Sequence, residues 1–167
     1  MGLKFLIDSA DPIIWAKFLK TGMFSGITTN PTLLKQAKQP CTLENIKFLT
    51  KEAKKLNCKE LHIQAWGESP IDIFNCGVAI GKLTSSKMPI YVKIPISEEG
   101  VKASSRLIKS NINITFTACF DIKQVLIASA VGASYIAPYL GRMNDEGKDG
   151  KLVLKNMQKI LDKTYSN

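Results

Sequence analysis

The stretch Pro89-Ile90-Tyr91-Val92-Lys93-Ile94 is an apolar run interrupted by one lysine, and it is predicted to form a buried strand. A helix is predicted directly after it, from Glu98 to Ser110. Ser97-Glu98-Glu99 supplies a capping hydroxyl and acids that suit the positive end of that helix. A second strand, Asn113 to Thr117, follows. Strand, helix and strand in this order are typical of a parallel sheet.

The same alternation runs through the whole chain. Strands are predicted at Leu3–Asp8, Phe24–Thr29, Glu60–Trp66, Pro89–Ile94, Asn113–Thr117 and Ser134–Pro138. Helices are predicted at Asp11–Lys20, Pro31–Lys38, Thr42–Leu56, Pro70–Leu83, Glu98–Ser110, Asp121–Val131 and Lys151–Thr164, with a Gly-rich loop from Gly141 to Gly150 before the last. Two architectures fit this order, a doubly wound open sheet and a (β/α) barrel. The sequence has no G-x-G-x-x-G or Walker phosphate loop.

Length and composition predict one globular domain over residues 1–167. The 167 residues are 45% hydrophobic and 22% charged, which is ordinary for a soluble protein with a real core. No apolar run is long enough for a membrane span. The short apolar run before Asp8 does not match a secretory signal. We therefore expect a cytoplasmic protein that has no membrane partner.

The charge and the cysteines argue against two further classes of partner. The net charge of +9 raises the possibility of nucleic-acid binding, but the lysines are spread over predicted helices without interleaved aromatic residues. A solvated helix face, with a positive field that attracts a phosphorylated substrate, explains this charge better. The four cysteines are not clustered with each other or with His62, the only histidine, so a metal site is not expected.

Polar side chains gather toward the carboxyl ends of the predicted strands. They are Asp8, Thr28-Thr29-Asn30, His62 and Gln64, Lys93, Thr115 and Thr117, and Tyr139 with Arg142 just beyond. Parallel strands covered on both faces are normally apolar, so these exceptions are informative. In a barrel, the carboxyl ends of the strands form the active-site rim.

Alternation along the strands sorts these side chains into layers. Residues two apart share a face, so closing the sheet would gather six of them around one mouth: Asp8, Asn30, Gln64, Lys93, Thr117 and Tyr139. His62 would lie one layer deeper, as a hydrogen-bonded core residue. Each position alone has a structural explanation, such as a lysine that reaches past a strand end to solvent. Their coincidence on one face favours a ligand site.

The sequence resembles the short transaldolases and fructose-6-phosphate aldolases, which are class I, Schiff-base aldolases on a TIM-type barrel. The matching segments are Phe5-Leu6-Ile7-Asp8-Ser9-Ala10, Gly26-Ile27-Thr28-Thr29-Asn30-Pro31-Thr32-Leu33, Val92-Lys93-Ile94-Pro95, Gly100-Val101-Lys102-Ala103 and Ala137-Pro138-Tyr139-Leu140-Gly141-Arg142. They follow one another in order across nearly the whole chain. The resemblance implies an enzyme of the pentose phosphate pathway with sugar-phosphate substrates and no cofactor, and we expect a homo-oligomer.

The resemblance also implies roles for single residues. Lys93 matches the Schiff-base lysine, and Asp8 matches the acid that handles protons. The matches that bind substrate are Asn30 with its neighbour Thr28, and Arg142 for the phosphate, while Thr117 matches the threonine that places a catalytic water. Gln64 and Tyr139 are the pair found in the fructose-6-phosphate aldolase branch, where transaldolases carry Glu and Phe. The pair favours release of free dihydroxyacetone over its transfer.

The predicted barrel departs from the resemblance in one respect. TIM-type barrels have eight strands, and the alternation here provides six β/α units, without the region of strands seven and eight or the phosphate-binding serine expected there. Three explanations stay open: a truncated product, strands completed by a partner subunit, or an adapted fold. A non-catalytic barrel remnant that serves as a binding or assembly module is therefore the alternative to an active aldolase or transaldolase.

Overall fold

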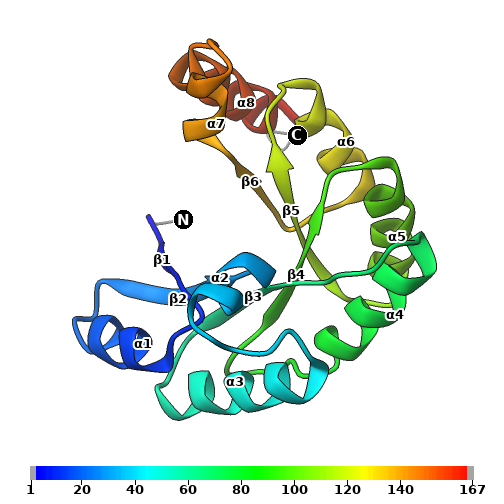
Figure 1. The fold of residues 1–167 in the computed structure, drawn as a ribbon. Helices are drawn as coiled ribbons and strands as arrows, with labels where there is room; N and C mark the ends of the chain where they lie inside the picture. Colours follow the sequence, from blue (N-terminus) through cyan, green and yellow to red (C-terminus); the bar gives the residue numbers. More distant parts are fainter. Residues whose placement is uncertain (1–2, 165–167) are drawn as a thin grey trace.

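The computed structural model describes residues 3–164, whose centre is one sheet of six parallel strands. The strands are β1 (Phe5–Asp8), β2 (Phe24–Thr29), β3 (Glu60–Gln64), β4 (Ile90–Pro95), β5 (Asn113–Cys119) and β6 (Tyr135–Pro138). They lie in the order in which they occur in the chain, and every neighbouring pair is parallel. Figure 1 shows the strands curling around a common interior with helices outside them. The fold is a half-barrel of the TIM type, as the sequence predicts, and not a doubly wound open sheet.

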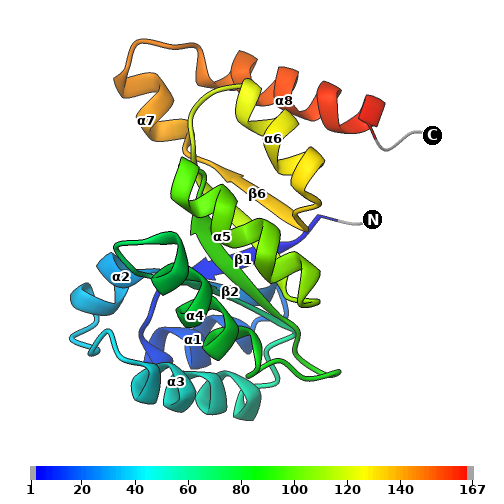
Figure 2. The same ribbon diagram turned by 90° about the vertical axis from the view of Figure 1, so that its right-hand side faces the viewer.

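Helices link the strands and cover the outer face of the sheet (Figures 1 and 2). They are α1 (Pro12–Leu19), α2 (Pro31–Gln36), α3 (Leu43–Lys55), α4 (Pro70–Gly81), α5 (Glu98–Lys109), α6 (Lys123–Val131), α7 (Leu140–Asp145) and α8 (Gly150–Thr164). Most starts carry the capping groups expected from the sequence. Asp11 accepts the Ile13 N–H at 2.8 Å with Pro12 in the first turn, and Ser97 accepts the Gly100 N–H at 3.1 Å. The first residue of these helices is thus determined by the local sequence.

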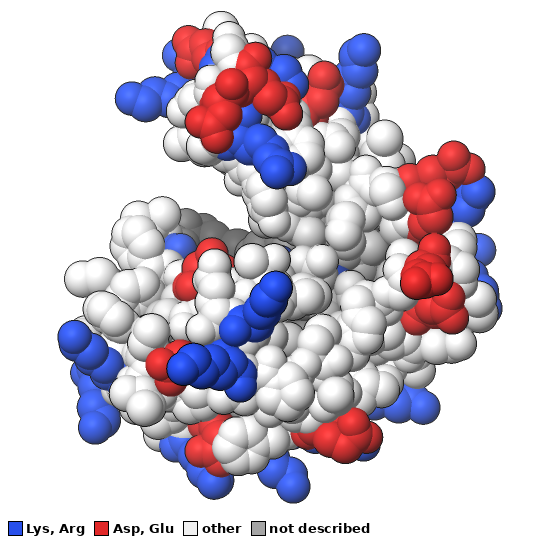
Figure 3. Space-filling view, in the orientation of Figure 1, with Lys and Arg blue, Asp and Glu red and all other residues white. Residues whose placement is uncertain are grey.

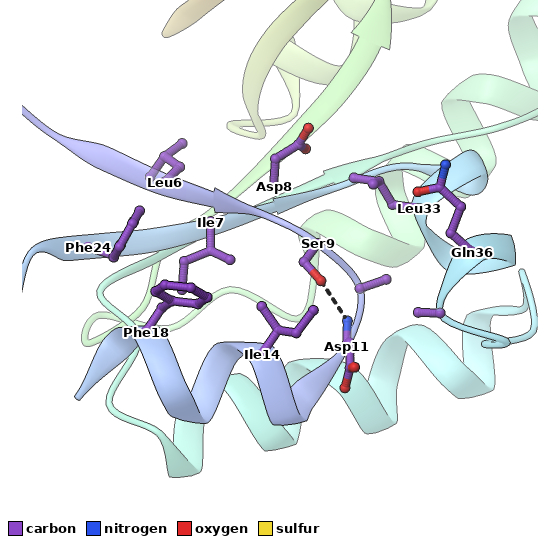
Figure 4. Close-up of a pocket in the computed structure, with 12 residues that line it drawn as sticks. Leu6, Ile7, Asp8, Ser9, Asp11, Ile14, Phe18, Phe24, Leu33 and Gln36 are labelled. Carbon is purple, nitrogen blue, oxygen red and sulfur yellow. Dashed lines mark hydrogen bonds between the residues drawn. The ribbon is translucent and has the colours of Figure 1, made fainter. Parts of the chain in front are cut away.

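The main core lies between the sheet and its helices. Trp15 of α1 and Phe116 of β5 are the largest fully buried side chains, and aliphatic residues from β2, β3 and β4 fill the space between them. Alternation along the strands separates this core from the interior of the half-barrel. Figure 4 shows Ile7 and Asp8 on opposite sides of β1, with Ile7 directed toward Phe18 and Ile14 of α1. The outer side of β1 faces an apolar hollow of about 450 Å³.

The region after β6 differs from the sequence prediction. The predicted Gly-rich loop from Gly141 to Gly150 overlaps the six-residue helix α7, which begins one residue earlier, at Leu140. Met143 of α7 is fully buried against Val125 and Met157, which form a second, smaller core cluster under α8. This tertiary packing outweighs the low helix propensity of Gly141. A smaller correction concerns Asp121, which accepts the Lys123 N–H but lies one residue before the N-cap of α6, Ile122.

The sheet does not close on itself within the described residues. β1 pairs only with β2 and β6 only with β5, so both are edge strands of the part of the chain that the structure describes. Figure 1 shows an open side between β1 and the β6–α7 region. No helix within residues 3–164 is long and apolar enough to span a bilayer. The predicted domain also includes residues 1–2 and 165–167, which lie outside the described residues.

Charged side chains are scattered over the outside of the half-barrel. Figure 3 shows lysines and arginines spread over this face, interspersed with acids and separated by uncharged surface. Several of the basic residues pair with acids on their own helix, as Lys55 does with Glu52 and Lys102 with Glu98. Such exposed pairs contribute little to stability. The pattern agrees with the predicted solvated helix faces.

Candidate active site

The carboxyl ends of the strands surround a cavity of about 350 Å³ on the inner face of the half-barrel. Its polar lining residues are Asp8, Thr28, Asn30, His62, Lys93, Thr115, Thr117, Tyr135 and Tyr139. They come from every strand of the sheet or from the residue that follows it. The pattern of polar residues at the strand ends predicts this arrangement, in which polar groups from six strands line one cavity.

Lys93 is the most unusual side chain in this cavity. It is 5% exposed, and its Nζ donates a hydrogen bond to the hydroxyl of Thr28 at 2.9 Å. Burial lowers the pKa of its ammonium below the ordinary value, and the carboxylate of Asp8 partly opposes that shift. A neutral amine is a nucleophile and an ammonium is not, so this burial favours the reactive form.

The fold places Lys93 through its neighbours on both sides. In the sheet register Lys93 lies opposite Gln64 of β3 and Thr115 of β5. Val92 and Ile94 point the other way, into the core, where both are fully buried. Burial of Val92 and Ile94 fixes the position of β4. The side chain of Lys93, which lies between them in the sequence, therefore extends from a rigid strand.

Asp8 and Asn30 stand at the ends of β1 and β2, on the side of the cavity next to Thr28. Asp8 is exposed and is the acid that acts on the pKa of Lys93. Asn30 caps α2 by accepting the Leu33 N–H with its Oδ1 at 2.9 Å. That bond fixes the side chain, so its NH₂ group is the part directed to other hydrogen-bond acceptors.

Thr117 and Tyr139 form the opposite side of the cavity. The hydroxyl of Thr117 donates to the hydroxyl of Tyr139 at 3.2 Å, which joins β5 to the residue after β6. Beside Thr117 the β5–β6 register is broken between Phe116 and Cys119, and Ala118 adopts a φ of 57°. A left-handed alanine costs about 1–2 kcal/mol. Such local strain often accompanies functional sites.

Two predicted site residues do not line this cavity. Gln64 is adjacent to Lys93 in register and half-buried, at the carboxyl end of β3. Arg142 is exposed on α7, with its guanidinium 5.6 Å from the ring centroid of Phe120. The ring of Phe120 packs edge-on against Tyr139 at 5.5 Å. Arg142 is therefore connected to the rim through Phe120, outside the cavity itself.

His62 lies at the floor of the cavity, as alternation along the strand predicts. It is 2% exposed, its Nδ1 is 2.9 Å from the hydroxyl of Thr115, and its ring stacks on Tyr91 at 4.7 Å. Burial, chiefly, lowers its pKa to about 4, with Lys93 adding repulsion and Glu60 opposing. His62 is thus a neutral core residue at pH 7.

The low pKa of His62 predicts acid-labile folding. In the unfolded chain the imidazole takes up a proton near pH 6.5, whereas in the folded chain it does so only near pH 4. The free energy of unfolding should therefore fall as the pH decreases from 6.5 to about 4. Urea unfolding of wild-type protein and His62→Phe at pH 7 and pH 4.5 measures this, and the difference between the two proteins should shrink or reverse at pH 4.5. An unchanged difference would contradict it.

Thr115 was among the polar strand-end residues but was not assigned to the predicted site, and Ala118 was not considered at all. Thr115 lines the cavity opposite Lys93 and holds His62, and its spacing of two from Thr117 was the available signal. The left-handed Ala118 has no signal in the sequence. Residues 3–164 contain no group of three or more His, Cys, Asp or Glu side chains arranged to bind a metal.

A curled parallel sheet with helices outside it defines this chain as a protein of the (β/α)-barrel class, and its polar groups gather at the carboxyl rim of that sheet. The sequence profile described as Transaldolase/Fructose-6-phosphate aldolase matches residues 5–166. The chain therefore belongs to the transaldolase/fructose-6-phosphate aldolase family.

Individual relatives agree with this assignment. "Probable transaldolase 2" of Listeria monocytogenes is 30% identical over 167 residues, covering 96% of this chain and 70% of the relative. A "Probable transaldolase" of Cereibacter sphaeroides is 29% identical over 160 residues, covering 96% of this chain and 69% of the relative. A crystal structure of KGPDC from Streptococcus mutans superposes with a TM-score of 0.61 at 14% identity, covering 97% of this chain and 73% of that one. This last likeness concerns the fold alone.

Proposed function

We propose that this protein is a class I aldolase or transaldolase that forms a Schiff base between Lys93 and a ketose phosphate such as fructose 6-phosphate. The observation that carries the proposal is the buried amine of Lys93, bonded to Thr28 inside a polar cavity. At pH 7 an ordinary lysine is neutral in roughly one molecule in 2,500. A pKa lowered by burial increases that fraction and makes attack on a carbonyl feasible.

The first half of the reaction makes an electron sink on Lys93. Its neutral amine adds to the C2 carbonyl of the ketose and gives a carbinolamine, which loses water to give a protonated imine. The hydroxyl of Thr28, which contacts the amine, is placed to orient the attacking nitrogen. Asn30 supports the substrate by offering its NH₂ group to sugar hydroxyl oxygens.

The second half breaks and remakes bonds to carbon. The C3–C4 bond cleaves, its electron pair passes into the imine to give an enamine, and the C4 hydroxyl loses its proton. Asp8, or a water held by Gln64, Thr117 and Tyr139, accepts that proton. An aldose phosphate leaves, and the three-carbon enamine stays on Lys93. Protonation and hydrolysis release dihydroxyacetone, whereas attack on an acceptor aldehyde transfers it.

Two residues outside the cavity bear on substrate and product. Arg142 would bind the phosphate through charge-assisted hydrogen bonds, and its contact with Phe120, which packs against Tyr139, supports this role. Gln64 and Tyr139 are the pair found in the fructose-6-phosphate aldolase branch of the family, so they favour release of free dihydroxyacetone. We also place the activity in pentose phosphate metabolism in the cytoplasm, carried out by a homo-oligomer of one-domain chains.

Product analysis tests the proposed reaction. Incubation with fructose 6-phosphate alone should release glyceraldehyde 3-phosphate and dihydroxyacetone, which coupled enzymes can detect. Adding erythrose 4-phosphate should accelerate glyceraldehyde 3-phosphate formation and suppress free dihydroxyacetone only if the chain is a transaldolase. Absence of glyceraldehyde 3-phosphate under both conditions would contradict the proposed function.

A further inference from the structure

A second polar cluster lies beneath the active-site cavity, and the proposed mechanism does not use it. Glu60 is 3% exposed, and its carboxylate accepts a hydrogen bond from the hydroxyl of Tyr135 at 3.0 Å. The ammonium of Lys4 lies 3.2 Å from one oxygen of Glu60 and donates to the hydroxyl of Tyr135 at 3.1 Å. The three side chains therefore form a closed triangle of polar contacts, which we call the floor triad.

The floor triad joins strands that are far apart in the sheet. Lys4 immediately precedes β1, Glu60 opens β3 and Tyr135 opens β6. β1 and β6 are the two edge strands of the described sheet, and they do not pair with each other. The Lys4–Tyr135 contact therefore spans the open side of the half-barrel, and Glu60 ties both edges to the middle of the sheet.

Each edge strand connects one triad residue to one site residue: Lys4 immediately precedes β1, which ends at Asp8, and Tyr135 opens β6, which Tyr139 follows. Lys4 precedes Asp8 by four positions, and Tyr135 precedes Tyr139 by four. In an extended strand, positions four apart lie about 13 Å from each other. A change in the separation of Lys4 and Tyr135 would thus be transmitted along the strands to Asp8 and Tyr139.

Neighbouring residues provide hydrogen bonds and space for the buried carboxylate of Glu60. Ser25 donates a further hydrogen bond to Glu60 at 3.3 Å. Gly26 supplies the space, because a Cβ there would come within 2.6 Å of the Cγ of Glu60. The ring of Tyr135 packs edge-on against His62 and Tyr91, with centroids 5.0 and 4.8 Å away. Leaving a buried charge without its partners is costly, so this geometry is strongly preferred once formed.

We propose that the floor triad is a latch that sets the separation of β1 and β6, and through it the positions of Asp8 and Tyr139 relative to Lys93. Lys4, Glu60 and Tyr135 are positioning residues, since they act through the strands. The latch holds the two edges at the amino ends of the strands, where no backbone pairing joins them within residues 3–164. Its catalytic consequence rests on the proposed function, whereas its effect on strand separation does not.

Distance measurement between the two edges tests the latch directly. Spin labels on Lys17→Cys of α1 and Lys155→Cys of α8, in a Cys41→Ser background, report the separation by pulsed electron resonance. Both positions are exposed. Tyr135→Phe keeps the ring but removes the hydroxyl, and Lys4→Met removes the ammonium. Each should shift the label–label distance to larger values and broaden its distribution. Lys59→Met, which removes an exposed ammonium immediately before β3, should leave the distribution unchanged.

The outcomes separate the latch from the proposed reaction. If Tyr135→Phe fails to fold, Lys4→Met decides, because the Lys4 side chain is 45% exposed and tolerates replacement. A wild-type distance distribution in folded Lys4→Met overturns the latch. Borohydride trapping of fructose 6-phosphate on Lys93 should slow by about tenfold in both latch variants, because small misplacements of reacting groups carry large rate penalties. Wild-type protein that traps no sugar contradicts the proposed function and leaves the distance result standing.

Discussion

Replacing Lys93 with methionine is expected to abolish turnover and covalent trapping while raising the free energy of unfolding at neutral pH by about 0.5–2 kcal/mol. The loss of activity follows from removing the proposed nucleophile, for which no other lysine lines the cavity. The gain in stability follows from burial, because Lys93 is 5% exposed and its ammonium is costly to bury. Activity and stability thus move in opposite directions.

The stability gain has a defined pH dependence. The pKa of Lys93 is lower in the folded chain than the 10.5 of the unfolded chain, so between these values the unfolded chain binds more protons. The cost of burying Lys93 is therefore complete below the folded pKa and fades as the pH rises toward 10.5. Denaturant unfolding should show the advantage of Lys93→Met at pH 7 and its decline at pH 10. Lys47→Met, an exposed lysine on α3, is the control and should change neither stability nor trapping. A Lys93→Met protein less stable than wild type at pH 7 would contradict a net cost of burying this ammonium.

Gly100→Ala is expected to destabilise the fold by about 3 kcal/mol, at the upper end of the range for overpacking. Gly100 lies in the first turn of α5, where a Cβ would overlap the carbonyl oxygen of Pro95 and press on Ile94. The added methyl group can be accommodated only if α5 moves away from the end of β4, two residues after Lys93. Denaturant unfolding and borohydride trapping should both detect this change.

Gly141→Ala is the matched control for Gly100→Ala. Gly141 lies inside α7, and a Cβ there would meet no atom within 4 Å. Alanine is a better helix former than glycine, so this variant should be more stable by roughly 0.5–1 kcal/mol. Equal unfolding midpoints for the two glycine variants would contradict the claim that close packing of α5 on β4 makes Gly100→Ala destabilising.

The sequence predicted the strands well because the central ones, β3, β4 and β5, are buried at most of their positions, which favours apolar residues there. Phe24–Thr29 was predicted with its observed bounds, and the other strands differ by two residues or fewer at their ends. In such strands a polar residue is conspicuous, which is why Asp8, Lys93 and Thr117 could be assigned to one cavity before the structure. Periodicity alone also placed His62 a layer deeper, where it is buried against Thr115.

What the sequence did not reveal depends on tertiary contacts. Helix α7 is short and contains Gly141, and it is stabilised by burial of Met143, which no local pattern reports. Gln64 and Arg142 lie outside the cavity because of where β3 ends and where α7 begins in three dimensions. The alternation of side chains along a strand does not predict either feature. In the sequence, Glu60 is a polar residue at the start of a predicted strand and has no other distinguishing feature. Its contacts with Lys4 and Tyr135 arise only in the folded structure.

The most direct test of the central claim is borohydride reduction of the protein in the presence of fructose 6-phosphate, followed by peptide mass spectrometry. We expect a three-carbon, dihydroxyacetone-derived adduct on the peptide that contains Lys93, dependent on the sugar and absent from Lys93→Met. Lys47→Met should form the same adduct as wild type. Wild-type protein that forms no adduct with this or any other ketose phosphate, or an adduct of equal yield in Lys93→Met, would contradict the claim that Lys93 is the Schiff-base nucleophile.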